Sequence, residues 1–76
     1  MTVTLADLRV GDRARVAGYS GTGPYVDQLI RLGLIPGTAI EVQRVAPLGD
    51  PVEIRFRGFS LVIRPDDAGC LQLEPA

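Results

Sequence analysis

One cysteine and a pair of aspartates are the side chains of this sequence best suited to hold a metal ion. Asp66 and Asp67 lie shortly before Cys70, and the chain contains no histidine. An iron or zinc site needs several histidine, cysteine or carboxylate ligands that converge on the ion. We therefore expect the aspartates to cap or solvate a turn, and Cys70 to fill a partly buried space where a strand starts. The sequence predicts no metal site and no cofactor.

Hydroxyl groups are the other candidates for covalent chemistry. Ser20, Ser60 and the threonines have no histidine or lysine in the chain to activate them, and a hydroxyl without an adjacent base is a poor nucleophile. The glycine-rich segment 18–23 has no lysine and no GxxxxGK pattern, so it is not a phosphate-binding loop. We predict no catalytic residue and do not expect an enzyme.

Arginine supplies all eight basic residues of the chain. Four of them, Arg13, Arg15, Arg55 and Arg57, are expected on the outward faces of strands because they alternate with apolar residues. The simpler interpretation is a solvated surface whose ion pairs contribute well under ~1 kcal/mol each. The alternative is a docking patch for an acidic partner surface, and the sequence leaves both open.

The two tyrosines lie in or beside the loop of residues 18–25. Tyr19 and Tyr25 could anchor a protein partner, because tyrosine is favoured at the centres of interfaces. The chain has no tryptophan, which argues against a groove for proline-rich peptides, since several aromatic residues usually line such a groove. We predict a partner surface over residues 19–31, with Tyr19, Tyr25 and Arg31 as its anchors.

Length, charge and cysteine content limit the class of protein. The 76 residues correspond to one domain, residues 1–76, and a net charge of −1 argues against a nucleic-acid-binding surface. A lone cysteine excludes an internal disulfide and fits a reducing compartment. No apolar segment has the length that a signal peptide or a membrane span requires. These features predict a soluble, cytosolic protein.

Proline and glycine mark the ends of the predicted elements in the first half of the chain. A helical turn near the N-terminus is followed by a half-buried strand over residues 12–17. Pro24 suits the first position of a helix over residues 24–32, and Gly33 suits the left-handed position that ends it. Pro36-Gly37 then fits the centre of a type II turn. The helix is therefore predicted to be short and sharply terminated.

The second half of the chain alternates as strands. These strands cover residues 38–45, 52–57 and 59–63, with a short last strand around Leu71 and Leu73. Closing about five such short strands into one barrel removes exposed edges and fills the interior with a single layer of side chains. The predicted fold is mainly β: a small barrel of about five short antiparallel strands with a helical insertion.

The alternation also predicts which side chains form the core. Phe59 is expected to face inward and Val62 outward, and a bulge is expected near Gln43-Arg44. The predicted core residues are Val16, Val26, Leu29, Leu32, Ile40, Val42, Ile54, Phe56, Leu61, Ile63, Leu71 and Leu73.

Short motifs in a fixed order extend along almost the whole chain. They are Leu5-Ala6-Asp7-Leu8 with Gly11, Leu29 with Leu32-Gly33, Pro36-Gly37-Thr38, Pro47-Leu48-Gly49-Asp50-Pro51, and Gly58 and Leu61 ahead of Arg64 and Ala68. In this order and spacing the chain resembles the FeoA family of bacterial ferrous-iron uptake. The resemblance implies an SH3-like β-barrel and a structural role for the motif residues. Arg64, at the end of a strand, is expected to make a structural hydrogen bond.

For function, the resemblance implies an accessory or regulatory role in ferrous-iron uptake. FeoA-like proteins are associated with FeoB, a membrane ferrous-iron permease with a cytosolic GTPase domain, so the implied partner is a FeoB-type permease bound at its cytosolic face. The same domain type also occurs at the C-terminus of metal-dependent repressors, which leaves a repressor-type regulatory module as the alternative. No DNA-binding helix pair precedes the first motif, which favours the free-standing form. The sequence leaves self-association open.

Overall fold

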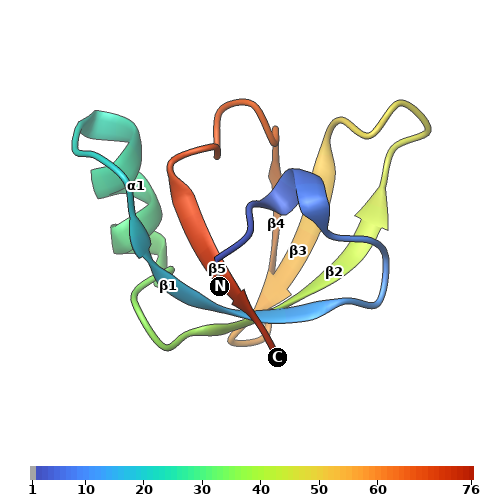
Figure 1. Cartoon of the computed structure of the whole chain (residues 1–76), viewed down its shortest axis with the longest axis horizontal. Helices are drawn as coiled ribbons and strands as arrows, with labels where there is room; N and C mark the ends of the chain where they lie inside the picture. Colours follow the sequence, from blue (N-terminus) through green and yellow to red (C-terminus); the bar gives the residue numbers. More distant parts are fainter. Residues whose placement is uncertain (1) are drawn as a thin grey trace.

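The computed structural model describes residues 2–76 and folds them around one strongly curved antiparallel sheet (Figure 1). The strands are β1 (Arg13–Tyr19), β2 (Ala39–Val45), β3 (Val52–Phe56), β4 (Phe59–Ile63) and β5 (Leu71–Pro75). Their order across the sheet is β4-β3-β2-β1-β5, and each neighbouring pair is antiparallel. The predicted mainly β fold with five short antiparallel strands is confirmed.

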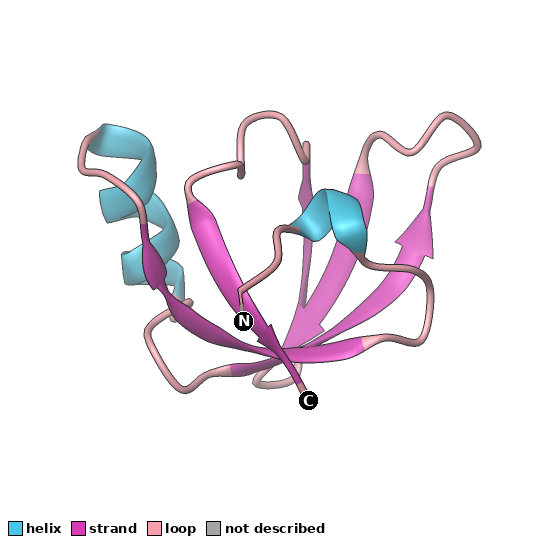
Figure 2. Ribbon diagram, in the orientation of Figure 1, coloured by secondary structure: helices cyan, strands magenta, loops and turns pink. Residues whose placement is uncertain are grey.

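Two helical segments accompany the sheet (Figure 2). A single 3-10 turn, Leu5–Asp7, lies on the inner side of the curved sheet, and its Leu5 side chain is buried in the core. Helix α1 (Pro24–Leu32) lies to one side of the sheet, beside the end of β1. This helix confirms the insertion predicted over residues 24–32.

The curved sheet does not close on itself through hydrogen bonds. β4 and β5 are the two ends of the strand order. At β5 an isolated bridge between Val3 and Leu73 continues the pairing, whereas β4 pairs with β3 alone among the described strands. The expectation that closure removes both edges is wrong, because residues 64–70 form turns and leave β4 and β5 unpaired with each other. An edge strand of this kind offers main-chain groups to a partner.

The core lies inside the curve of the sheet, and all but two of the predicted core residues are buried there. Leu32 is 44% exposed, and Leu61 is only half-buried. Both line a shallow hollow between α1 and β4. The core also contains five buried residues that the prediction missed: Leu5, Ala14, Leu34, Val52 and Ala68.

In strand β4, a side chain on the core-facing side of the sheet is not always buried. Directly paired residues of antiparallel strands share a face, so Phe59 and Ile63 face the same side as their partners Phe56 and Val52. Ile63 is 5% exposed, but Phe59 is 65% exposed because it lies at the hairpin end of an edge strand. The inward orientation predicted for Phe59 agrees with the register, although its side chain is largely exposed. Val62 is exposed on the other face, as predicted.

The end of α1 has the hydrogen bonds of a Schellman cap. The Gly33 N–H donates to the Ile30 carbonyl at 3.0 Å, and the Leu34 N–H donates to the Leu29 carbonyl at 3.1 Å. Gly33 has φ +108°, a conformation that side chains disfavour. The chain therefore turns sharply and returns Leu34 to the core beside Leu29.

The next turn starts β2. The Thr38 N–H donates to the Ile35 carbonyl at 3.0 Å, and Gly37 has φ +93°, in agreement with the predicted type II turn. The Thr38 hydroxyl also donates to the Gly33 carbonyl at 2.9 Å. This hydrogen bond links the turn before β2 to the turn that ends α1.

A bulge and a tight hairpin turn shape the sheet. The register of β2 against β3 shifts between Val42 and Arg44, which places a bulge at Gln43 as predicted. The β3–β4 hairpin turns through Arg57 and Gly58, whose φ values of +52° and +80° fit a tight two-residue turn. The strand predicted over residues 52–57 therefore ends at Phe56, and Arg57 lies in the turn.

The motif Pro47-Leu48-Gly49-Asp50-Pro51 lies in the turn that joins β2 to β3. Gly49, with φ +83°, donates its N–H to the Ala46 carbonyl at 2.7 Å. Arg64 Nη1 lies 3.9 Å from Asp50 Oδ2, an ion pair longer than a hydrogen bond. The Arg64 carbonyl instead accepts a hydrogen bond from the Ala68 N–H at 3.0 Å. Within residues 2–76 the Arg64 side chain has an ion pair and no hydrogen bond, so the structure does not show the side-chain hydrogen bond expected at Arg64.

Candidate functional site

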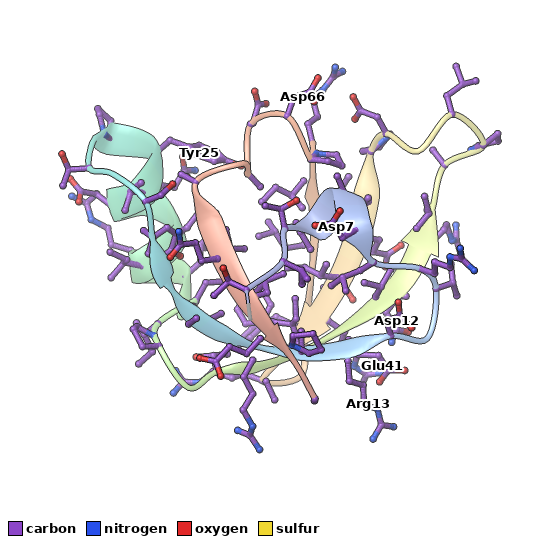
Figure 3. The ribbon with its side chains drawn as sticks, viewed as in Figure 1. Asp7, Asp12, Arg13, Tyr25, Glu41 and Asp66 are labelled. Carbon is purple, nitrogen blue, oxygen red and sulfur yellow. The ribbon has the colours of Figure 1, made fainter. Side chains whose placement is uncertain are left out.

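The residues considered for metal binding do not form a site. Within residues 2–76, no group of three or more histidine, cysteine, aspartate or glutamate side chains could hold an ion. Asp66 and Asp67 are exposed in the turn before β5, and Cys70 is a half-buried free cysteine. Figure 3 shows Asp66 at the outer end of this turn, pointing away from the sheet.

Tyr19 has a structural contact that the sequence did not predict. Its hydroxyl donates a hydrogen bond to the Leu34 carbonyl at 2.6 Å, which ties the end of β1 to the segment after α1. Burial raises the pKa of Tyr19 from 10.0 to about 12, and the nearby Cys70 and Tyr25 add to the rise. A phenol held in this way keeps its proton and supports the fold, so its hydroxyl is not free to bind a partner.

Tyr25 lies at the start of α1 and faces the turn that precedes β5 (Figure 3). It is half-buried against the core. Burial raises its pKa, and the negative charges of Asp67 and Cys70 raise it further. Tyr19 and Tyr25 are thus brought together beside Cys70, and each leaves only part of its ring exposed.

Arg31 lies at the opposite end of α1 and belongs to a different surface. It is exposed and lines a shallow hollow of about 260 Å³ together with Leu32 of α1 and Phe59 and Leu61 of β4. The three residues predicted as partner anchors therefore do not form one patch. The structure places the two tyrosines at one end of the helix and Arg31 at the other.

The hollow beside Arg31 is the best candidate for a docking surface, and we call Arg31, Leu32, Phe59 and Leu61 the α1–β4 surface. Leu32 and Phe59 are 44% and 65% exposed, and large apolar side chains exposed together often mark protein-binding sites. The unpaired edge of β4 runs along the same surface. Leu32 was predicted to lie in the core and Phe59 to face inward, so neither was predicted as part of a partner surface.

The Tyr19 hydrogen bond gives a testable prediction. We expect Tyr19→Phe to lower the free energy of unfolding by about 1 kcal/mol, because the Leu34 carbonyl loses its partner. The pKa of Tyr19 is about 12 in the folded protein, against about 10 in an unfolded chain, so the stabilising effect of the protonated phenol is complete below about pH 10. That effect is lost as the pH rises through about 12.

Thermal melts between about pH 8 and about pH 12 measure this effect, since that interval spans both pKa values. The Tm of the wild-type protein should fall more steeply over this range than the Tm of Tyr19→Phe. Parallel curves for the two proteins would refute the assigned role of the phenol.

Among residues 2–76, no helix has the length and apolar character needed to cross a membrane.

Sequence and structural relatives agree with one another. The model of one protein family, the FeoA domain, matches residues 3–75. The chain is 31% identical over 70 residues to the Fe(2+) transport protein A/Fe(2+) transporter FeoB fusion protein of Porphyromonas gingivalis. That match covers 92% of this chain and 8% of the fusion protein, so this chain spans only a small part of its relative.

Two solved structures share the fold. Iron(II) transport protein A from Clostridium thermocellum matches with a TM-score of 0.89 and 30% identity, covering 97% of this chain and 46% of that chain. The zinc complex of FeoA from Stenotrophomonas maltophilia, described as an SH3 domain protein, matches with a TM-score of 0.82 and 18% identity, covering 95% of this chain and 89% of that chain. The fold is SH3-like.

Proposed function

The chain belongs to the FeoA family, and on this premise we propose that it is an accessory protein of ferrous-iron uptake that binds a FeoB-type permease. The observation that carries the proposal is the fusion of a similar domain with a FeoB transporter in one polypeptide. Fusion holds two domains at a high effective concentration, which favours their contact. A separate chain must supply the same contact through its own binding surface.

The α1–β4 surface is the part of the molecule that suits this contact. Phe59 is a large aromatic side chain at the rim of a shallow hollow, and Arg31 adds a charged group beside it. Aromatic residues and arginine contribute most strongly to binding at protein interfaces. We propose that the permease covers this hollow with a cytosolic segment, which places this protein in the cytosol.

The proposed action is regulation by contact. The part of the chain that the structure describes gathers no metal-binding cluster, and its serines have no histidine or lysine to activate them. An effect on transport would therefore arise from a change that binding makes in the permease. Such an effect requires that binding differ between two states of the permease.

Co-purification tests the proposal. The tagged protein should recover the FeoB-type permease of its own organism from detergent-solubilised membranes. Phe59→Asp should weaken recovery at least about tenfold, because it places a charge where an apolar side chain is buried against the partner. Val10→Asp is the matched control, since Val10 is 61% exposed and lies outside the α1–β4 surface.

The outcomes separate the two functions left open by the sequence. Loss with Phe59→Asp and normal recovery with Val10→Asp supports permease docking at the α1–β4 surface. Equal recovery with both variants excludes that surface. Recovery of a DNA-binding repressor without the permease would favour the repressor-type regulatory module.

A further inference from the structure

The outer face of the sheet concentrates arginine side chains in one place. Arg13 and Arg15 come from β1, Arg55 comes from β3 and Arg57 comes from the β3–β4 turn, and all four line one hollow of about 440 Å³. We call these four residues the arginine face. Figure 3 shows Arg13 and the neighbouring Glu41 on the convex side of the sheet, pointing away from the core.

The strand register fixes how these charges are arranged. Glu41 of β2 lies opposite Arg13 on one side and Arg55 on the other. Ala39 lies opposite Arg15, and Arg57 lines the hollow on its other flank. One row thus contains a carboxylate between two arginines. In the next row the methyl group of Ala39 lies opposite Arg15, and Arg57 lines the hollow from the β3–β4 turn. The small Ala39 side chain leaves the second row hollow.

Most of these arginines have no carboxylate partner within residues 2–76. Arg13 lies 3.8 Å from Glu41. Within residues 2–76, Arg15, Arg55 and Arg57 have no carboxylate oxygen within 4.0 Å, whereas Arg44 and Arg64 elsewhere are paired. Four arginines and one glutamate give the hollow a side-chain charge of +3 in a chain whose net charge is −1.

One of these side chains, that of Arg15, is held in position before any ligand arrives. Arg15 Nη1 donates to the Gly37 carbonyl at 3.2 Å. The Arg57 side chain extends to Gly33, where its Nη1 would lie 3.4 Å from an added Cβ. Guanidinium groups that are held in place lose less conformational entropy when they bind a carboxylate.

We propose that the arginine face binds an extended acidic segment of a partner protein, with side-chain carboxylates paired to Arg15, Arg55 and Arg57. Three neighbouring strands span about 10 Å, which is the length of about three residues of an extended chain that crosses them. Arginine pairs with carboxylates through two parallel hydrogen bonds, so each position can select a carboxylate by geometry as well as by charge. The binding does not depend on which protein supplies the segment.

The observations favour a peptide over a phosphate-bearing polymer or membrane. Glu41 lies in the middle of the face. Its carboxylate repels a continuous row of phosphates, whereas the spaced carboxylates of a peptide can lie on either side of it. The negative net charge of the chain also opposes the long-range attraction that nucleic acids and anionic membranes need.

An NMR titration with a hexaglutamate peptide, blocked at both ends, tests the proposal. Amide shifts should concentrate at Arg15, Ala39 and Arg57, and a hexaglutamine peptide should cause none. Raising the salt from about 25 mM to about 150 mM should weaken binding several-fold, because exposed charges are screened. Shifts that concentrate elsewhere, or no binding at low salt, would overturn the proposal.

Paired variants separate the arginine face from overall charge. Arg15→Gln with Arg57→Gln should weaken hexaglutamate binding about tenfold or more, since two charge-assisted contacts are lost. Arg9→Gln with Arg44→Gln removes the same charge from outside the hollow, and it should change the affinity less than about twofold. Equal losses in the two double variants would overturn the proposal.

Two further measurements complete the test. If the first double variant does not fold, Arg15→Gln with Arg55→Gln replaces it with the same expected loss. Vesicles of phosphatidylglycerol and a single-stranded oligothymidylate are competitors, and displacement of hexaglutamate by either at lower concentration would assign the face to a membrane or to nucleic acid instead. None of these experiments contains the permease. A failure of the permease-docking proposal would therefore not contradict this inference.

Discussion

Replacing Gly33 with valine should lower the free energy of unfolding by roughly 2–4 kcal/mol. Gly33 has φ +108°, and a β-branched residue is strained in that conformation. An added Cβ would also lie 3.4 Å from Arg57 Nη1 and 3.7 Å from Phe56 Cε2, so larger substituents crowd both side chains. Urea denaturation followed by circular dichroism measures the change.

Variants at two other glycines distinguish the stability cost of backbone strain from that of side-chain crowding. Gly37 has φ +93° with nothing within 4 Å of an added Cβ, so Gly37→Val should cost about 1–2 kcal/mol through strain alone. Gly21 has neither a positive φ nor a close neighbour, and Gly21→Val should change stability by less than about 0.5 kcal/mol. If Gly33→Val and Gly37→Val unfold at the same urea concentration as Gly21→Val, the turn assignments are incorrect.

Truncation of Leu34 should have an equally large effect. Leu34 is fully buried, and Leu34→Ala should cost about 2–5 kcal/mol through lost burial and the cavity left behind. Its main chain also holds two contacts, because its N–H donates to Leu29 and its carbonyl accepts from Tyr19. A domain this small has little stability to spare, so the cooperative transition of Leu34→Ala should shift strongly or disappear.

Leu48→Ala is the matched control for this truncation. Leu48 is 95% exposed on the β2–β3 turn, so the same change of side chain should alter stability by less than about 0.5 kcal/mol. A melt of Leu34→Ala that overlays that of Leu48→Ala would contradict the description of the core.

Local signals were enough to predict most of the fold. Pro24 and Gly33 marked the two ends of α1, and Gly37 marked the turn into β2, because each position needs a backbone conformation that few residues supply. The bulge at Gln43 followed from a break in the alternation. These features depend on neighbours in the sequence, so a sequence can specify them.

Burial at the open side of the sheet could not be predicted in the same way. Leu32 and Phe59 have apolar side chains at core positions of their own elements, yet both are exposed. Their exposure depends on β4 remaining an edge strand and on α1 lying beside it, which are properties of the assembled sheet. Ala68 was missed for the converse reason, since an irregular segment shows no periodicity that would mark it as buried.

The candidate site was predicted only in part. Residues 19–31 were expected to contain it, and Arg31 does line the α1–β4 surface. Tyr19 instead makes a hydrogen bond to Leu34, a residue fifteen positions away. Contacts at such separations arise when distant segments meet in the folded chain, and neither composition nor spacing reveals them.

We propose that this protein works by binding a FeoB-type permease through the α1–β4 surface. Titration of the fluorescently labelled protein with the purified permease in lipid nanodiscs tests this proposal most directly. The wild-type protein should show saturable binding that Phe59→Asp abolishes and Val10→Asp preserves. A folded wild-type protein that shows no binding at any permease concentration reached would contradict it.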